Sequence, residues 1–259
     1  MADETVHGTG EPPPESVRED EIAGGSAIAL PAVESRPPGF TGWTVDPLPG
    51  PVPSGSRAVP AHKPLLAPRS ATAVLFTALA RATHEGEPDM AAAVEQVARA
   101  QPLTELPRRP IVTLRYGVQV LADISVSMEP FARDVEEVVG RVRALVGVAG
   151  TQILYFSDSP LRGAGEGPRA SWVAYRPPPP GTTVLILSAL GLVGPLFNPH
   201  RAGSKEWLET VRLIRLHASR PVILIPVPER RWPYWLRSAL PAVVWDRGTT
   251  VGHVHGTVR

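Results

Sequence analysis

The segment LADISVSMEP, residues 121–130, lies between an apolar run and an amphipathic one and carries an aspartate and two serines at alternate positions. The apolar run before it, residues 118–122, is typical of a buried strand. The residues after it, 131–146, have apolar side chains in one helical stripe and charged side chains opposite. The segment is therefore predicted to be a strand-to-helix loop, with Asp123 at the carboxyl end of the strand.

Further short apolar runs alternate with helical patterns through the rest of the chain. Strands are predicted at residues 111–114, 152–156, 172–175, 183–190, 222–227 and 242–245, and helices at residues 204–218 and 233–240. Most of these strands lack a clean apolar-polar alternation, as parallel strands between two helix layers do. We predict an α/β fold, a doubly wound three-layer sandwich with a mainly parallel sheet.

The chain divides into four parts by composition. Residues 1–68 are rich in Pro, Gly and Ser without periodic apolar positions, which predicts a disordered tail. Residues 69–106 contain two helical patterns and are predicted to form a helical hairpin. The α/β domain is assigned to residues 107–252, and residues 253–259 are interpreted as a C-terminal tail.

Composition excludes several classes of function. A net charge of +1 gives no general attraction to nucleic acid or membrane surfaces. The absence of cysteine excludes disulfides and thiolate sites. No apolar run approaches the ~18 residues of a membrane span, and the acidic start does not resemble a secretory signal. These features predict a cytoplasmic protein without a membrane partner.

Two interpretations of the aspartate-serine loop remain open. Asp123, Ser125 and Ser127 can turn towards one point and bind a hard cation such as Mg²⁺ through oxygen. Alternatively, Ser127 caps the following helix and Asp123 accepts hydrogen bonds from loop amides, with no metal. Spacing alone favours the second interpretation by roughly two to one.

Residues 111–252 resemble a von Willebrand factor A domain. The resemblance is carried by VQVLADISVSM with the helix after it, by the strand ending in Ser157-Asp158, and by VLILSALG. The family signature Asp-x-Ser-x-Ser, which forms a metal-ion-dependent adhesion site, matches at Asp123, Ser125 and Ser127.

The chain departs from this family at two further positions of the metal site. It reads SALG at residues 188–191, so that Ala189 stands where the family has an aspartate. The family also uses a middle-loop threonine, for which Thr182 and Thr183 are the nearby threonines. The resemblance therefore implies a degenerate site with weak or absent Mg²⁺ binding.

Residues 220–250 resemble more narrowly the von Willebrand A component of bacterial ternary systems. In those systems it is associated with a MoxR-type AAA+ ATPase and an effector, in a stress or conflict role. The resemblance implies a non-enzymatic adaptor for these two partners.

Arginines and aromatic residues cluster at Arg230, Arg231, Trp232, Trp235 and Arg237. Such a cluster can pack on the sheet, bind a protein partner or stack on single-stranded nucleic acid, and we rank the three roles in that order. The adaptor hypothesis assigns the cluster to partner binding.

The rival hypothesis is a metal-assisted hydrolase or nucleotide-using enzyme with Asp123 as metal ligand. A phosphate-transfer site would need a second aspartate where Ser125 stands. Ser188 lacks the preceding glycine of a nucleophile elbow. Residues 163–168 lack the ending of a P-loop and are expected to be a flexible loop. The absence of a complete catalytic constellation favours the adaptor.

Overall fold

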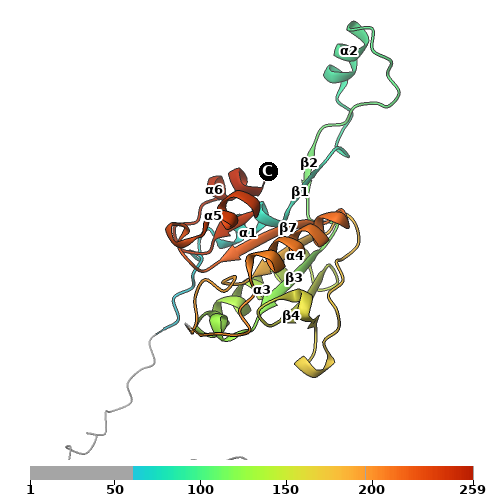
Figure 1. The fold of residues 1–259 in the computed structure, drawn as a ribbon. Coiled ribbons are helices and arrows are strands. Elements are labelled where there is room, and N and C mark those ends of the chain that lie inside the picture. Colours follow the sequence, from blue (N-terminus) through green and yellow to red (C-terminus); the bar gives the residue numbers. More distant parts are fainter. Residues whose placement is uncertain (1–60, 196, 259) are drawn as a thin grey trace, which may run out of the picture. The chain divides into compact units, whose positions relative to one another are not determined.

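The computed structural model describes residues 61–195 and 197–258, and this part of the chain is an α/β fold (Figure 1). Of the predicted disordered tail at residues 1–68, the part up to residue 60 lies outside the described residues. The prediction is wrong for residues 61–68, because Leu66 is buried in the core. The main sheet has six strands: β3 (Val118–Asp123), β4 (Thr151–Phe156), β5 (Ala164–Gly165), β6 (Thr183–Leu187), β7 (Arg220–Ile225) and β8 (Ala242–Val244).

The strands of this sheet lie in the order β5-β4-β3-β6-β7-β8. All neighbours are parallel except β5, which is antiparallel to β4. Numbered along the chain, this is the order 3-2-1-4-5-6 of a doubly wound sheet, which reverses direction between β3 and β6. β3 pairs with both β4 and β6 in parallel register, so the carboxyl ends of all three strands meet at one edge.

The helices form two groups by their contacts. α1 (Ala71–Leu79) packs against α3 (Ala132–Val146) and α6 (Val251–Val258), whereas α4 (Ser204–Leu216) packs against β7 and α5 (Tyr234–Ala239). Because β3-α3-β4 and β6-α4-β7 run in opposite directions from the reversal point, right-handed connections put α3 and α4 on opposite faces. This grouping is compatible with a three-layer sandwich.

The core consists of buried strand residues and of the buried stripes of α1, α3 and α4. Every residue of β3 and β6 is buried. On α3 the buried apolar residues recur at helical spacing: Val135, Val138, Val139 and Val142. Phe156 and Trp207 meet edge to face with their ring centres 6.0 Å apart, which joins β4 to α4.

The predicted helical hairpin at residues 69–106 is not formed. α1 ends at Leu79, and β1 (Arg81–Thr83) then pairs antiparallel with β2 (Ile111–Thr113), with α2 (Met90–Ala98) in the connection between them (Figure 1). α1 instead has five buried residues and packs on α3 and α6, so it belongs to the main domain. The guanidinium of Arg81 donates a 2.6 Å hydrogen bond to the carbonyl of Gly181. This contact favours a helix that ends before Arg81.

Two other expectations are wrong. Residues 251–258 form helix α6 rather than an extended tail, because Val254 is fully buried in a helix that packs on α1. Residues 172–175 make one isolated bridge, Ala164 to Val173, and no strand. The four prolines at residues 177–180 cannot donate the hydrogen bonds that would extend a ladder there.

The predicted flexible loop at residues 163–168 contains the short edge strand β5. Gly165 fits here because a Cβ atom at this residue would lie 2.8 Å from the indole of Trp172. Short 3-10 turns complete the fold: η1 (Val126–Phe131), η2 (Pro160–Arg162), η3 (Arg169–Ser171) and η4 (Glu229–Arg231). In the described part of the chain, no helix has the length and apolar character needed to cross a bilayer.

Candidate functional site

Asp123 and Ser188 meet at the point where the sheet reverses direction. Asp123 is the last residue of β3, and Ser188 directly follows β6. The Ser188 hydroxyl donates a 2.7 Å hydrogen bond to Oδ2 of Asp123, and both residues are buried. Ligands of doubly wound sheets bind at this reversal point, so its polar groups decide what the site can do.

The other carboxylate oxygen of Asp123 is held by two backbone amides. Oδ1 accepts from the N–H of Ser125 at 2.9 Å and from the N–H of Asp158, which follows β4, at 3.3 Å. Asp158 has a left-handed backbone with φ of 63°. The prediction that Asp123 accepts hydrogen bonds from loop amides is confirmed. Protein donors therefore occupy both oxygens.

The two serines of the motif bond to each other rather than capping a helix. Their hydroxyl oxygens are 2.8 Å apart, and both residues are buried. Ser127 lies inside η1 and makes no capping bond, so the prediction that it caps the following helix is wrong. Gly194 passes close by with φ of 106°, and a Cβ atom there would lie 3.2 Å from the Cβ of Ser127. The loop after β6 thus covers the serines.

Burial raises the pKa of Asp123 above its ordinary value, and the hydrogen bonds from Ser188, Ser125 and Asp158 oppose this shift. A raised pKa disfavours the charged form that a cation requires. Ala189 is buried beside Ser188 and adds no carboxylate.

Thr182 and Thr183 lie at the opposite end of β6 from the motif. Their hydroxyls donate to the carbonyls of Tyr116 and Leu79. The motif thus offers a cation one carboxylate, whose two oxygens also accept protein hydrogen bonds, together with two serine hydroxyls.

The apolar residues of the motif face outwards. Ile124 and Val126, which alternate with the buried polar residues, are 53% and 52% exposed. From the end of β3 into the start of η1, the polar side chains take the inward side and the apolar ones the outward side. The sequence-based interpretation of the motif rests on its polar residues and does not include Ile124 and Val126. In the sequence, Ile124 and Val126 alternate strictly with polar residues whose side chains bind one another. This alternation is the pattern that could have predicted their exposure.

A groove of about 420 Å³ adjoins this loop. Its apolar wall comes from the loop, α3 and β4: Ile124, Met128, Ala132, Val135, Val139 and Tyr155. Charged residues also line it: Asp123, Glu129, Glu136 and Arg143. A largely apolar concavity with a few charged groups is typical of a binding site.

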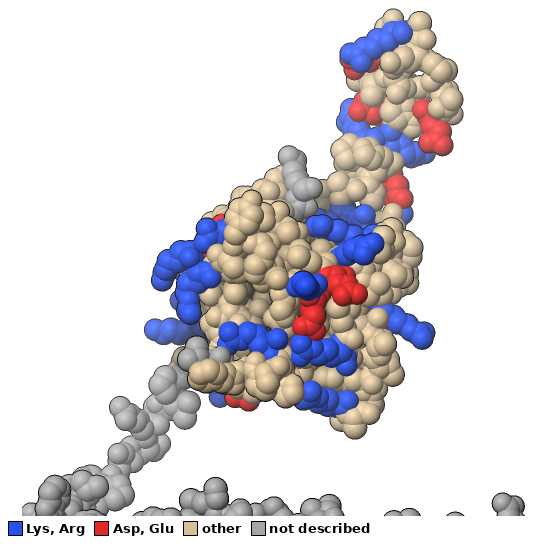
Figure 2. Space-filling view, in the orientation of Figure 1, with Lys and Arg blue, Asp and Glu red and all other residues tan. Residues whose placement is uncertain are grey.

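The arginine-tryptophan cluster divides into a buried part and a surface part. Trp232 is buried, and its indole N–H donates a 2.8 Å bond to the carbonyl of Val227, so this side chain packs in the fold. Trp235 is half-buried. Arg230, Arg231 and Arg237 are exposed. Figure 2 shows Lys and Arg side chains beside the region that α5 occupies in Figure 1.

Comparison of the chain with protein-family models, with curated proteins and with solved structures gave no match. A doubly wound sheet supports many unrelated functions. What the protein does therefore depends on the chemistry of its site, which comprises Asp123, the groove beside it and the exposed arginines.

Proposed function

We propose that this protein is a non-enzymatic interaction module of the von Willebrand A type, in a three-layer sandwich with a degenerate metal-ion-dependent adhesion site. It works in the cytoplasm as an adaptor between a MoxR-type AAA+ ATPase and an effector, in a bacterial stress or conflict system. One observation carries the proposal. The motif at residues 123–127 turns its polar side chains inwards to one another and its apolar side chains outwards.

The state of Asp123 supports a structural role over a catalytic one. A metal ligand, general base or nucleophile needs a carboxylate oxygen that a reactant or ion can approach. Asp123 is 2% exposed and accepts three hydrogen bonds from the protein. Its carboxylate joins the ends of three strands and thereby fixes the loop that bears Ile124 and Val126.

The exposed face of this loop supports protein binding. Interface centres are apolar and contain pockets that accept an anchoring side chain. Ile124 lines the groove, whose volume suits one or two large side chains, while Glu129 and Arg143 can bind polar groups at its border. A partner that inserts an apolar anchor here binds without a metal ion.

An adaptor needs a second surface for its second partner. Arg230, Arg231 and Arg237 are exposed on η4 and α5, elements that do not line the groove. Arginine is enriched at interfaces and binds carboxylates in a bidentate manner. We assign this arginine surface to an acidic face of the second partner.

Affinity capture with matched surface variants tests the proposal. Ile124→Arg should abolish recovery of the AAA+ ATPase from the native host. Val148→Arg is the matched control, because Val148 is 75% exposed and does not line the groove. Equal recovery with Ile124→Arg and the control would contradict the proposed surface. Mg²⁺- or Mn²⁺-dependent turnover of a phosphoester or ester that Asp123→Asn abolishes would establish the rival enzyme function.

A further inference from the structure

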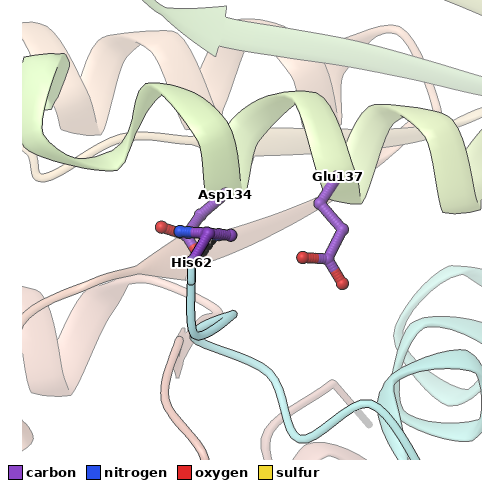
Figure 3. A group of neighbouring side chains, drawn as sticks. All are labelled: His62, Asp134 and Glu137. Carbon is purple, nitrogen blue, oxygen red and sulfur yellow. Dashed lines mark ion pairs between the residues drawn. The ribbon is translucent and has the colours of Figure 1, made fainter. Parts of the chain in front are cut away.

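Three potential metal ligands, none of which lines the groove, lie close together beside α3 (Figure 3). His62 precedes α1, and Asp134 and Glu137 lie one turn apart on α3. One ligand atom from each residue lies within 4.8 Å of the other two. His62 Nε2 is 3.4 Å from Asp134 Oδ1.

Asp134 is a buried carboxylate whose charge lacks a permanent partner. It is 6% exposed, and among the described residues no Lys or Arg pairs with it. The N–H of Leu65 donates a 2.7 Å bond to Oδ1. His62 compensates the charge only when its imidazole is protonated. Buried charges are otherwise paired or coordinate metals, so a cation held between Asp134 and a neutral imidazole is the alternative.

We propose that His62, Asp134 and Glu137 bind Zn²⁺. One nitrogen and two carboxylate oxygens form a donor set that suits zinc, whereas Mg²⁺ prefers oxygen ligands throughout. Zinc bonds of about 2.1 Å in a tetrahedron place neighbouring ligand atoms about 3.4 Å apart. The His62-Asp134 spacing of 3.4 Å already has this value.

Glu137 can complete the site through one of its two carboxylate oxygens. Arg141 donates both of its hydrogen bonds to Oε1 of Glu137, at 3.0 and 2.9 Å, and this leaves Oε2 available. The side chain is partly exposed, and rotation about its terminal bonds would bring this oxygen to the ion. Leu65 and Arg141 then act as outer hydrogen-bond donors that orient the two carboxylates. The fourth position is taken by water.

Bound zinc would join the segment before α1 to α3. An ion that binds the folded chain alone stabilises it in proportion to the logarithm of its concentration over the dissociation constant. This site shares no residue with the Asp123 motif, so it stands or fails independently of the adaptor function.

Calorimetric titration of the full chain tests the site. The protein carries an affinity tag without histidine, is stripped of metal with EDTA and dialysed, and is titrated with Zn²⁺. We expect one ion per chain, binding at least about 10-fold weaker in His62→Ala, and no change in the control His84→Ala, an exposed histidine outside the cluster. Absence of binding by the wild type, or equal binding by His62→Ala, would overturn the proposal.

Glu137→Gln separates a three-ligand site from a simple His62-Asp134 ion pair. Its side chain is partly exposed, so the variant is expected to fold. A zinc site loses affinity in this variant, and Co²⁺ in the wild type gives a visible absorption band that both variants weaken. If zinc raises the unfolding temperature of no form of the protein, the contact is an ion pair only and the proposal fails.

Discussion

Ser188 and Asp123 are 65 positions apart in the chain, yet the hydroxyl of one donates a 2.7 Å hydrogen bond to Oδ2 of the other. The bond joins the carboxyl ends of β6 and β3, and the amide of Asp158 adds the end of β4. The carboxylate thus holds together the edge of the sheet at which a ligand would otherwise bind. The next three predictions depend on this structural role of Asp123.

Ser188→Ala should destabilise the protein. The substitution leaves Oδ2 of Asp123 buried without its donor, and loss of a buried hydrogen bond to a charged group costs about 2 kcal/mol. Urea unfolding measures the change in free energy. Ser171→Ala is the control, because Ser171 is exposed, and it should change the free energy by less than about 0.5 kcal/mol. Equal effects of the two substitutions would contradict the bridging role.

Asp123→Asn should change how stability depends on pH. The pKa of Asp123 in the folded protein lies above its ordinary 3.8, so the folded state binds this proton more tightly than the unfolded chain does. The free energy of unfolding therefore falls as pH rises from about 3.8 through the raised pKa, and the contribution is constant above it. The wild-type value minus the variant value should fall over this interval. A difference that rises with pH would show a lowered pKa instead.

Millimolar Mg²⁺ should not raise the unfolding temperature of the wild type. The carboxylate of Asp123 already accepts three protein hydrogen bonds, and Ala189 supplies no second one. Differential scanning fluorimetry with and without the ion measures this. A rise that is present in the wild type and absent in Asp123→Asn would demonstrate an intact metal site.

Tyr175→Phe should cost about 1 kcal/mol, since it removes the donor to a buried amide oxygen. The Tyr175 hydroxyl donates a 2.8 Å bond to Gln119, whose amide nitrogen donates to Gln152 across the β3-β4 pair. Tyr234→Phe provides the comparison, because Tyr234 is highly exposed, and thermal unfolding of both variants measures the difference. If Tyr175→Phe unfolds like the wild type, the hydroxyl does not stabilise the sheet.

The central strand and the helix after it could be predicted from the sequence, because local patterns of apolar residues indicate which of their side chains are buried. The strand predicted at 118–122 is Val118–Asp123, and the helix predicted at 131–146 is Ala132–Val146. An apolar run buried on both faces and a stripe at helical spacing specify these elements without distant residues.

The hairpin β1-β2 and helix α6 could not be predicted in this way, because both depend on distant contacts. Thr83 is in a strand because it pairs with Ile111, and α6 is a helix because Val254 is buried where it packs on α1. The candidate site could be predicted only in part, for the same reason. The sequence identifies the motif residues Asp123, Ser125 and Ser127, but the donors Asp158 and Ser188 are brought to Asp123 by other strands.

Affinity capture of the tagged full-length protein from its native host tests the central claim most directly. Two lanes contain EDTA, and one of them also contains an excess of Mg²⁺, so that zinc is chelated in both and only magnesium differs. The account predicts recovery of a MoxR-type AAA+ ATPase in both lanes. Recovery only with Mg²⁺ would show that the protein still has a magnesium-dependent binding site and would contradict the account.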